Sequence, residues 1–323
     1  MNITNDFTLS RLGLGCESAK KSDSESITTI RSFLDNGMNY LNTADFYGHG
    51  ESEMAIREAL KTHKRDEVFI SLKFGGLVAP DGSFYGIDVR PQDIKNYLAY
   101  SLKRLDTDYV DLYQPARINP HIPVEDTIGG VADLVTAGYV RNIGLSEVDA
   151  DTLRRAHAIH PISMVEMQYS LLNRTIEDSL IPVARELGIG IVAFGVLFHG
   201  VIGGRRPAEK IDMLSKRLTP QAQEKLQQAV TRLDLLKKLA IEKGVTLSQL
   251  AIAWVMAQGD DILTLVGSRT LEQLQNTIKA GDIHLSQDDL RRIEQAVPKE
   301  YTSNSAMLPL NLDQNGLFVF PTR

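Results

Sequence analysis

Short apolar runs of strand length alternate with amphipathic helical segments along the chain, and no linker or low-complexity stretch interrupts them. The alternation gives eight strand–helix units at spacings of roughly 25 to 40 residues. This pattern predicts one α/β domain over residues 1–323, folded as a (β/α)8 TIM barrel. A doubly wound sheet is the alternative. It is disfavoured because no Gly-x-Gly-x-x-Gly sequence opens the first helix.

The periodicities also give approximate bounds for each element. After a first strand that ends at Gly15, strands are expected at residues 38–41, 68–72, 109–114, 139–146, 163–169, 190–194 and 262–266. Helices are expected at residues 24–36, 51–60, 91–104, 124–137, 178–187, 221–243 and 248–258, and a further helix, capped by Asp149 or Asp151, ends at His160. Extra C-terminal helices are expected to begin near Thr270, where Thr270 and Gln273 would form a capping box, and near Ser286. Outside the barrel units we expect an N-terminal β-hairpin within Phe7–Gly15, loops at 74–89 and 195–207, and a loose tail after Pro298.

Charge and cysteine content limit the partners. The net charge is −6 with both signs mixed and no basic run, so no nucleic-acid partner is expected. Cys16 is the single cysteine, which excludes an intrachain disulfide, and a buried thiol is favoured over a nucleophile. No apolar stretch reaches membrane length, so we expect a cytoplasmic protein that acts on a small molecule, with its oligomeric state left open.

Chemistry is expected where the strand at 38–41 ends. Tyr47 lies in the polar loop that follows this strand, and Lys73 ends the next apolar run. Neighbouring parallel strands would bring both side chains to the same end of the sheet. A lysine ammonium beside a phenol lowers the pKa of the phenol, which then becomes a credible proton donor to a carbonyl oxygen. The competing interpretation is a loop aromatic residue and a barrel-lining lysine without catalytic roles.

The segment around Tyr47 reads Asn-Thr-Ala-Asp-Phe-Tyr-Gly-His-Gly-Glu-Ser-Glu over Asn42–Glu53. It resembles the aldo-keto reductase superfamily, and the likeness extends along nearly the whole chain. The resemblance implies NADP(H)-dependent reduction of an aldehyde or ketone, with hydride from nicotinamide C4 and a proton from Tyr47. Tyr47 and Lys73 match two residues of the family's catalytic tetrad of Asp, Tyr, Lys and His. Asn42 stands in the place of the Asp and Ala116 in the place of the His, so Lys73 is expected to lack an anionic partner.

The resemblance also implies which residues hold the cofactor. Around the nicotinamide these are Ser146 and Glu166 at the carboxamide, with Glu166 where the family commonly has Gln, and Phe194, whose ring stacks on the nicotinamide. The loop over the pyrophosphate is matched by Gly195, Leu197 and Gly200.

A third group resembles the site for the adenosine 2′-phosphate. Ser268 and Arg269 would begin a helix, where backbone amides favour an anion, and Arg269 adds a bidentate fork that suits phosphate. The residues matched to this end of the cofactor are Gly267, Ser268, Arg269, Gln273, Asn276 and Thr277.

Within the family the chain looks most like the pyridoxal-reductase-like subgroup, which suggests a pyridoxal-like or other small aromatic aldehyde as substrate. Arg117, next to Ala116, could meet an anionic substrate or pair with an acid of the barrel. Two other functions remain open. One is a cofactor-binding sensor or regulatory subunit with little turnover, like the potassium-channel β subunits that share the fold. The other is a barrel that has lost the cofactor, which Ser268 and Arg269 disfavour.

Overall fold

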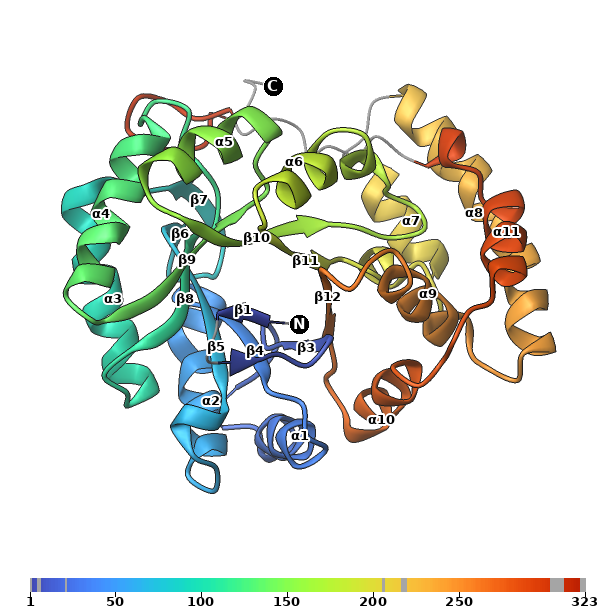
Figure 1. The fold of residues 1–323 in the computed structure, drawn as a ribbon, viewed down its shortest axis with the longest axis horizontal. Helices are drawn as coiled ribbons and strands as arrows, with labels where there is room; N and C mark the ends of the chain where they lie inside the picture. Colours follow the sequence, from blue (N-terminus) through green and yellow to red (C-terminus); the bar gives the residue numbers. More distant parts are fainter. Residues whose placement is uncertain are drawn as a thin grey trace.

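In this computed structural model a ring of parallel strands closes on itself inside a layer of helices (Figure 1). The structure describes residues 2–4, 7–20, 22–204, 207–215, 220–302 and 311–319. Within these ranges the closed barrel has eight strands in the order β10-β11-β12-β3-β4-β5-β8-β9, so β4 and β10 face each other across it. The barrel strands are β3 (Leu12–Gly15), β4 (Tyr40–Ala44), β5 (Phe69–Phe74), β8 (Val110–Pro115), β9 (Val140–Ser146), β10 (Ile162–Gln168), β11 (Gly190–Phe194) and β12 (Ile262–Gly267). The predicted TIM barrel is confirmed.

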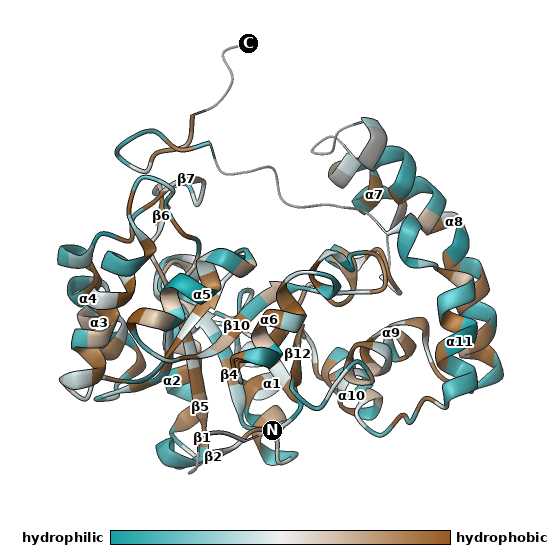
Figure 2. Ribbon diagram, turned by 45° about the horizontal axis from the view of Figure 1, so that its top comes forward, coloured by the Kyte–Doolittle hydropathy of each residue, from teal (hydrophilic) through white to brown (hydrophobic). Residues whose placement is uncertain are grey.

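The helices form the outer layer, and Figure 2 shows apolar strands enclosed by helices whose hydrophilic residues lie on the outside. They are α1 (Ser24–Asp35), α2 (Glu51–Leu60), α3 (Pro91–Leu105), α4 (Val124–Thr136), α5 (Ala150–Ile159), α6 (Leu180–Glu186), α7 (Pro207–Ser215), α8 (Pro220–Glu242), α9 (Leu247–Met256), α10 (Leu271–Ala280) and α11 (Gln287–Ala296). Helix α11 packs against α8 on the side of the molecule that also carries α9 (Figure 1). No single described helix is long and apolar enough to cross a membrane, and the one pair that reaches this length, Gln223–Glu242 with Leu247–Met256, is bent by 91°.

Local chemistry explains the helix boundaries. The Asp23 carboxylate accepts a hydrogen bond from the Glu25 amide at the start of α1, and the Asp149 carboxylate accepts from Thr152 at the start of α5. Pro91 opens α3 in the first helical turn, where a missing N–H costs nothing. The sequence had left Asp149 and Asp151 as alternative caps for α5, and Asp149 is the cap.

An apolar layer fills the barrel interior below its C-terminal end. Side chains at alternate strand positions point inward, so inward residues recur every second position. The layer is formed by Leu9, Tyr40, Phe69, Leu112, Met164, Val192, Leu263 and Leu265. The Phe7 ring packs against Phe69 with centroids 5.8 Å apart, so the N-terminal segment covers the bottom of the barrel. The opposite end is left for polar residues.

Three segments differ from the expectation. The N-terminal hairpin begins earlier than predicted, because β1 (Asn2–Thr4) pairs with β2 (Phe7–Thr8). The expected loop at 74–89 contains an antiparallel hairpin of β6 (Gly76–Val78) and β7 (Phe84–Ile87). Helix α7 begins at the last residue of the loop predicted at 195–207 and runs through a stretch where no element was predicted; residues 205–206 of that loop lie outside the described ranges.

The prediction of a loose tail is wrong for residues 311–319. The amide of Ile87 donates to the Gly316 carbonyl at 2.8 Å, and the amide of Phe318 donates to the Tyr85 carbonyl at 2.9 Å. The tail therefore adds backbone hydrogen bonds to an edge of the β6–β7 hairpin that would otherwise stay unpaired. Residues 303–310 and 320–323 of the predicted tail lie outside the described part of the chain.

Candidate active site

A layer of buried polar side chains lies directly above the apolar layer of the barrel. Asn42, Ser71, Gln114 and Glu166 each follow an inward apolar residue of the same strand by two positions, so they share its inward direction. All four are nearly inaccessible to solvent. The carboxyl ends of barrel strands carry catalytic groups in TIM-barrel enzymes, and this layer occupies that end.

Lys73, on β5, has an anionic partner in this layer. Its ammonium donates to Asn42 Oδ1 at 2.5 Å and to Glu166 Oε1 at 3.1 Å. The two charged side chains of this ion pair are only 6% and 4% exposed. The contact between Lys73 and Asn42 is confirmed, whereas the expectation that Lys73 lacks an anion is wrong, because Glu166 reaches across from β10.

Glu166 is the centre of the polar layer rather than a free hydrogen-bond acceptor. Its second oxygen accepts hydrogen bonds from Asn42 Nδ2 and Gln114 Nε2, each at 2.7 Å. Ser71 Oγ accepts from the same two amides at 3.2 and 3.3 Å. We name Asn42, Tyr47, Lys73, Gln114 and Glu166 the mouth cluster. Sequence reasoning missed Gln114, although its place two residues beyond the apolar Leu112 could have identified it.

Tyr47 lies above Lys73, as the sequence predicts. Ala44, at the end of β4, pairs in register with Lys73, and the chain then turns into η1 (Tyr47–Gly50). Gly48, His49 and Gly50 all have left-handed backbone conformations, with φ of 58°, 54° and 93°, and they fold the loop over the strand ends. The Lys73 ammonium lies 5.2 Å from the centroid of the Tyr47 ring.

The electrostatics of Tyr47 differ from the expectation. Burial raises the pKa of Tyr47, Lys73 lowers it through its charge and a hydrogen bond, and Glu166 raises it again, so the pKa lies above its usual value. Lys73 therefore acts in the predicted direction, but burial outweighs it. For Lys73 itself, burial lowers the pKa while Glu166 and Tyr47 raise it, and the result is a raised pKa. The lysine is thus a cation in this protein at neutral pH.

The position that the resemblance assigns to a histidine is occupied by Ala116, buried at the end of β8. Arg117 follows it and donates to the Ala116 carbonyl at 2.6 Å and to Ser146 Oγ at 3.4 Å. Among the described residues it makes no direct ion pair, so the predicted pairing with a barrel acid is not observed. Arg117 lowers the pKa of nearby Glu147, but burial raises it more strongly.

The residues expected around the nicotinamide come together at the ends of adjacent strands. Ser146 ends β9 and lies in register with Glu166, and Phe194 ends β11 in register with Gln168. The Phe194 ring is partly exposed and packs on the apolar layer. Beyond it, Gly195 and Gly200 have φ of 65° and 83°, and a side chain at Gly200 would meet nothing within 4 Å. The loop that carries Leu197 therefore stays open at its surface.

The residues expected at the adenosine phosphate lie at the rim, between β12 and α10. The helix begins at Leu271, with Thr270 as its cap, rather than at Ser268. The capping box predicted for Thr270 and Gln273 is half formed, because the Gln273 side chain accepts from the Arg269 amide at 2.9 Å and not from Thr270. Arg269 is exposed and donates through Nε to Ser18 Oγ at 3.2 Å.

The remaining residues of this group are tied to neighbouring segments. Ser268 and Thr277 share a hydrogen bond at 3.5 Å, and Gly267 ends β12 beside them. Asn276 donates to Ser248 Oγ at 3.3 Å, which links α10 to the second residue of α9. Arg269 is thus the exposed cation of this part of the rim.

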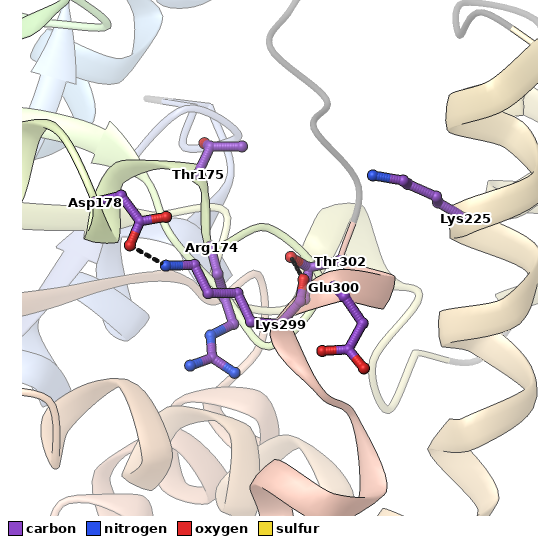
Figure 3. A pocket seen from close by; sticks show the side chains of 7 residues that line it. All are labelled: Arg174, Thr175, Asp178, Lys225, Lys299, Glu300 and Thr302. Carbon is purple, nitrogen blue, oxygen red and sulfur yellow. Dashed lines mark hydrogen bonds and ion pairs between the residues drawn. The ribbon is translucent and has the colours of Figure 1, made fainter.

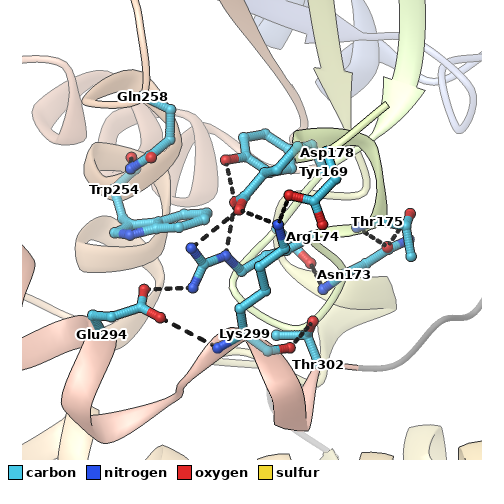
Figure 4. A network of polar contacts seen from close by, with 12 residues as sticks. Tyr169, Asn173, Arg174, Thr175, Asp178, Trp254, Gln258, Glu294, Lys299 and Thr302 are labelled. Atoms are coloured by element: carbon cyan, nitrogen blue, oxygen red, sulfur yellow. Dashed lines mark hydrogen bonds and ion pairs between the residues drawn. The ribbon is translucent and has the colours of Figure 1, made fainter. Parts of the chain in front are cut away.

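A second charged region lies on the flank of the barrel. Arg174 donates to Glu177 at 2.7 Å and to Glu294 at 2.6 Å, and Lys299 lies 3.4 Å from Glu177 (Figure 4). Tyr169 donates its hydroxyl to the same Glu177 at 2.8 Å. We name these residues the flank cluster: Tyr169, Arg174, Glu177, Glu294 and Lys299.

A depression of about 500 Å³ opens beside the flank cluster, where Lys225 of α8 faces Arg174 and Lys299 (Figure 3). Lys299 is paired with Asp178 as well as with Glu177. Carboxylates neutralise both Arg174 and Lys299, and no tyrosine among the described residues lines this depression, so it lacks the phenol–ammonium pair of the barrel mouth.

Comparison with known proteins assigns the family. Residues 11–298 match the model of the aldo/keto reductase family. The chain is also 37% identical, over 91% of its length and 87% of the relative's, to a probable aldo-keto reductase 1 of Glycine max. The chain belongs to the aldo/keto reductase family.

Solved structures agree with this assignment. A thermostable aldo-keto reductase, Tm1743, in complex with the inhibitor epalrestat, is 26% identical and matches with a TM-score of 0.70 over 90% of this chain and 97% of that one. The glycerol dehydrogenase AKR11B4 of Gluconobacter oxydans (24% identical, TM-score 0.78, 90% and 92% covered) shares the fold. So does an aldo/keto reductase of Klebsiella pneumoniae in complex with NADP and acetate (24% identical, TM-score 0.71, 90% and 92% covered).

Proposed function

We propose that this aldo/keto reductase is an NADPH-dependent enzyme that reduces an aldehyde or ketone to an alcohol. The observation that carries the proposal is the Lys73 ammonium, fixed by Asn42 and Glu166 in a buried network, directly beneath the Tyr47 ring. A phenol beside a cation at the open end of a barrel is suited to general acid catalysis.

Features of the mouth fit the proposed cofactor. The Ser146 hydroxyl lies at a strand end, the Phe194 ring is partly exposed, and Gly200 faces open space. Arg269 stands exposed at the rim near the start of α10, where a phosphate would find both a cation and backbone amides. The NADP complex of the Klebsiella pneumoniae relative, which shares the fold, adds support.

In the proposed reaction the bound cofactor would supply the hydride, and residues of the chain would supply the proton and stabilise the charge that remains. Tyr47 donates its proton to the carbonyl oxygen as negative charge develops there. Lys73 stabilises the tyrosinate that remains, and its own position is held by Asn42 and Glu166. Because Ala116 cannot hydrogen-bond through its side chain, Tyr47 is the proton donor and receives no help from an imidazole at position 116.

For the substrate we propose a small aromatic aldehyde, pyridoxal-like or similar, in keeping with the subgroup that the sequence resembles. The support is an aromatic wall beside Tyr47. Phe46 meets Tyr47 edge-on at 5.0 Å and Phe84 of β7 at 5.1 Å, and Phe84 is 45% exposed. Exposed aromatic side chains at a site entrance favour an apolar or aromatic ligand.

The first experiment measures NADPH consumption with a panel of aldehydes and then compares cofactors. A charge-assisted contact is worth about 1.5–3 kcal/mol, so Arg269→Ala should weaken NADPH binding roughly ten- to a hundredfold and leave NADH binding nearly unchanged. Fluorescence titration measures both dissociation constants. Arg154→Ala, which removes an exposed arginine paired with Glu186 on the outer helices, is the matched control and should change neither. Equal NADPH and NADH affinities in the wild type would contradict the phosphate assignment.

A second function, a cofactor-binding sensor with little turnover, is favoured by Ala116 alone. It predicts tight NADPH binding together with no aldehyde-dependent consumption across the whole panel. The same two measurements therefore separate the two functions.

A further inference from the structure

Two departures from the family pattern meet inside the barrel. Asn42 of β4 stands where the pattern has Asp, and Glu166 of β10 stands where it has Gln. These residues are 124 positions apart in sequence and on opposite walls of the barrel, yet Asn42 Nδ2 donates to Glu166 Oε2 at 2.7 Å. Relative to the family pattern, the carboxylate and the amide of positions 42 and 166 are exchanged, and the two side chains are in direct contact.

We propose that Glu166 is the relocated counter-charge of Lys73, a positioning residue that neutralises and orients the lysine from β10 where a carboxylate at position 42 would otherwise act from β4. The effect on catalysis rests on the reductase function proposed above. The effect on folding does not, because it concerns the protein without cofactor.

The burial of the three side chains supports this role. As whole residues, Asn42, Lys73 and Glu166 are each less than 5% exposed, so water cannot replace a missing partner. An ammonium that is buried without an anion is costly, and removing one partner of a buried ion pair destabilises strongly. Lys73 reaches both Asn42 Oδ1 and Glu166 Oε1, so it would keep one carboxylate contact whichever of the two positions carried the charge.

Gln114 makes the exchange sterically and chemically feasible. Its Nε2 donates to Glu166 and to Ser71, while its Oε1 is buried without a hydrogen-bond partner among the described residues. If position 166 carried an amide, a rotation of the Gln114 amide by half a turn would present Oε1 to that new donor. The Ser71 hydroxyl both accepts and donates, so it can follow the rotation.

Other titratable groups near Lys73 do not compete for this role. Burial raises the pKa of the Cys16 thiol to about 12, with Lys73 opposing the shift, and burial also raises the pKa of Tyr40. Both groups are therefore neutral near pH 7. Glu17 is exposed, so solvent screens its charge, and Tyr47 is the phenol on which Lys73 acts. Compared with these four groups, Glu166 is the buried carboxylate that contacts Lys73.

The test compares Glu166→Gln, Asn42→Asp and the double variant. Glu166→Gln leaves Lys73 unpaired, and Asn42→Asp sets a second carboxylate against Glu166, so each alone should lower the melting temperature of the cofactor-free protein. The double variant restores one carboxylate and one amide and should regain most of that loss. In single-turnover reduction the basic limb of the pH profile should shift down by about one to three pH units in Glu166→Gln, because both Lys73 and Tyr47 lose a neighbouring negative charge.

Ser71→Ala is the matched control, because it removes two uncharged hydrogen bonds from the same layer. It should lower the melting temperature without moving the basic limb. An unmoved limb in Glu166→Gln would overturn the proposal, and so would a double variant no more stable than the weaker single variant. If no aldehyde is reduced, the reductase function fails, and the melting temperatures still decide whether Glu166 is the partner of Lys73.

Discussion

The mouth cluster and the flank cluster both combine a tyrosine, a cation and a carboxylate, but they set the phenol against opposite charges. In the mouth cluster the Tyr47 ring faces the ammonium of Lys73 at 5.2 Å. In the flank cluster the Tyr169 hydroxyl donates to the Glu177 carboxylate at 2.8 Å. Burial first, and then Glu177, raise the pKa of Tyr169, and its proton is already committed to an anion. The mouth cluster alone offers a phenol whose proton loss a cation would stabilise.

The clusters also differ in how completely their cations are paired. Arg174 donates to Glu177 through two nitrogens and to Glu294 through a third, and its guanidinium lies 5.2 Å from the Trp254 ring. This pairing joins the segment after β10 to α11 and so stabilises the fold. Lys73 is held from one side by Asn42 and Glu166, so that it remains available to Tyr47 on the other. A fully paired cation stabilises the fold, and a partly paired one can serve chemistry.

The largest expected effect follows from removing the Tyr47 hydroxyl. Tyr47→Phe keeps the ring and its packing but removes the proton donor, and general acid catalysis contributes about 10²–10⁴-fold, so turnover should fall by that factor. NADPH affinity and melting temperature should stay close to those of the wild type. Steady-state kinetics with the best aldehyde measure turnover, fluorescence titration measures NADPH affinity, and thermal unfolding gives the melting temperature.

Tyr169→Phe is the matched control for this comparison. It removes one hydrogen bond to a carboxylate and should cost roughly 1.5–3 kcal/mol of folding stability, with turnover retained at temperatures well below unfolding. Wild-type turnover in Tyr47→Phe would show that the proton comes from another group, His49 of the same loop being the nearest candidate in sequence.

The contrast between the clusters also shows what the sequence could and could not predict. Local patterns located the barrel elements well: α2 and β11 lie at the predicted residues, and Tyr47 and Lys73 meet as adjacent strand ends require. Two-residue periodicity gives the face on which a side chain lies. It does not give the level along the barrel axis at which side chains from non-neighbouring strands meet, so the contact from Glu166 to Lys73 could not be anticipated.

Segments that depend on long-range pairing were also missed. Residues 311–319 carry no periodic pattern of their own, and they are ordered by backbone hydrogen bonds to β7. The hairpin of β6 and β7 lies in a glycine-containing stretch that propensity assigns to a loop. In both cases tertiary contacts outweighed the local preference.

An intermediate effect is expected from breaking the flank cluster. Arg174→Met leaves the aliphatic bulk but removes the ion pairs of Arg174 with Glu177 and Glu294. Breaking a buried pair costs about 3–5 kcal/mol, and we expect the lower end because Glu177 keeps Lys299. Denaturant unfolding measures the loss. Arg155→Met breaks an exposed pair with Glu125 and should cost less than about 1 kcal/mol. Equal losses in the two variants would mean that the flank cluster contributes no more than a surface ion pair.

The smallest effect concerns Asp45, a carboxyl group in the loop between β4 and η1 that belongs to neither cluster. Burial first, and then Glu53, raise the pKa of Asp45 from 3.8 to about 7, against the opposing effect of Arg104, which is itself bound to Glu53. One oxygen of Asp45 is buried without a hydrogen-bond partner among the described residues. Within the described part of the chain, Asp45 is therefore a buried carboxyl group without a cation bound to it, whereas Glu166 binds Lys73.

The sign of the pH effect follows from the raised pKa. Between pH 3.8 and about 7 the unfolded chain has lost the Asp45 proton while the folded protein retains it, so this group makes stability fall as pH rises through that window. Asp45→Asn removes the titration. Its melting temperature should match the wild type near the acidic end of the window and exceed it by a growing margin up to about pH 7, beyond which the margin should stay constant. A margin independent of pH would mean that the Asp45 pKa is ordinary, and that burial on this loop costs a carboxylate little even when no cation is bound to it.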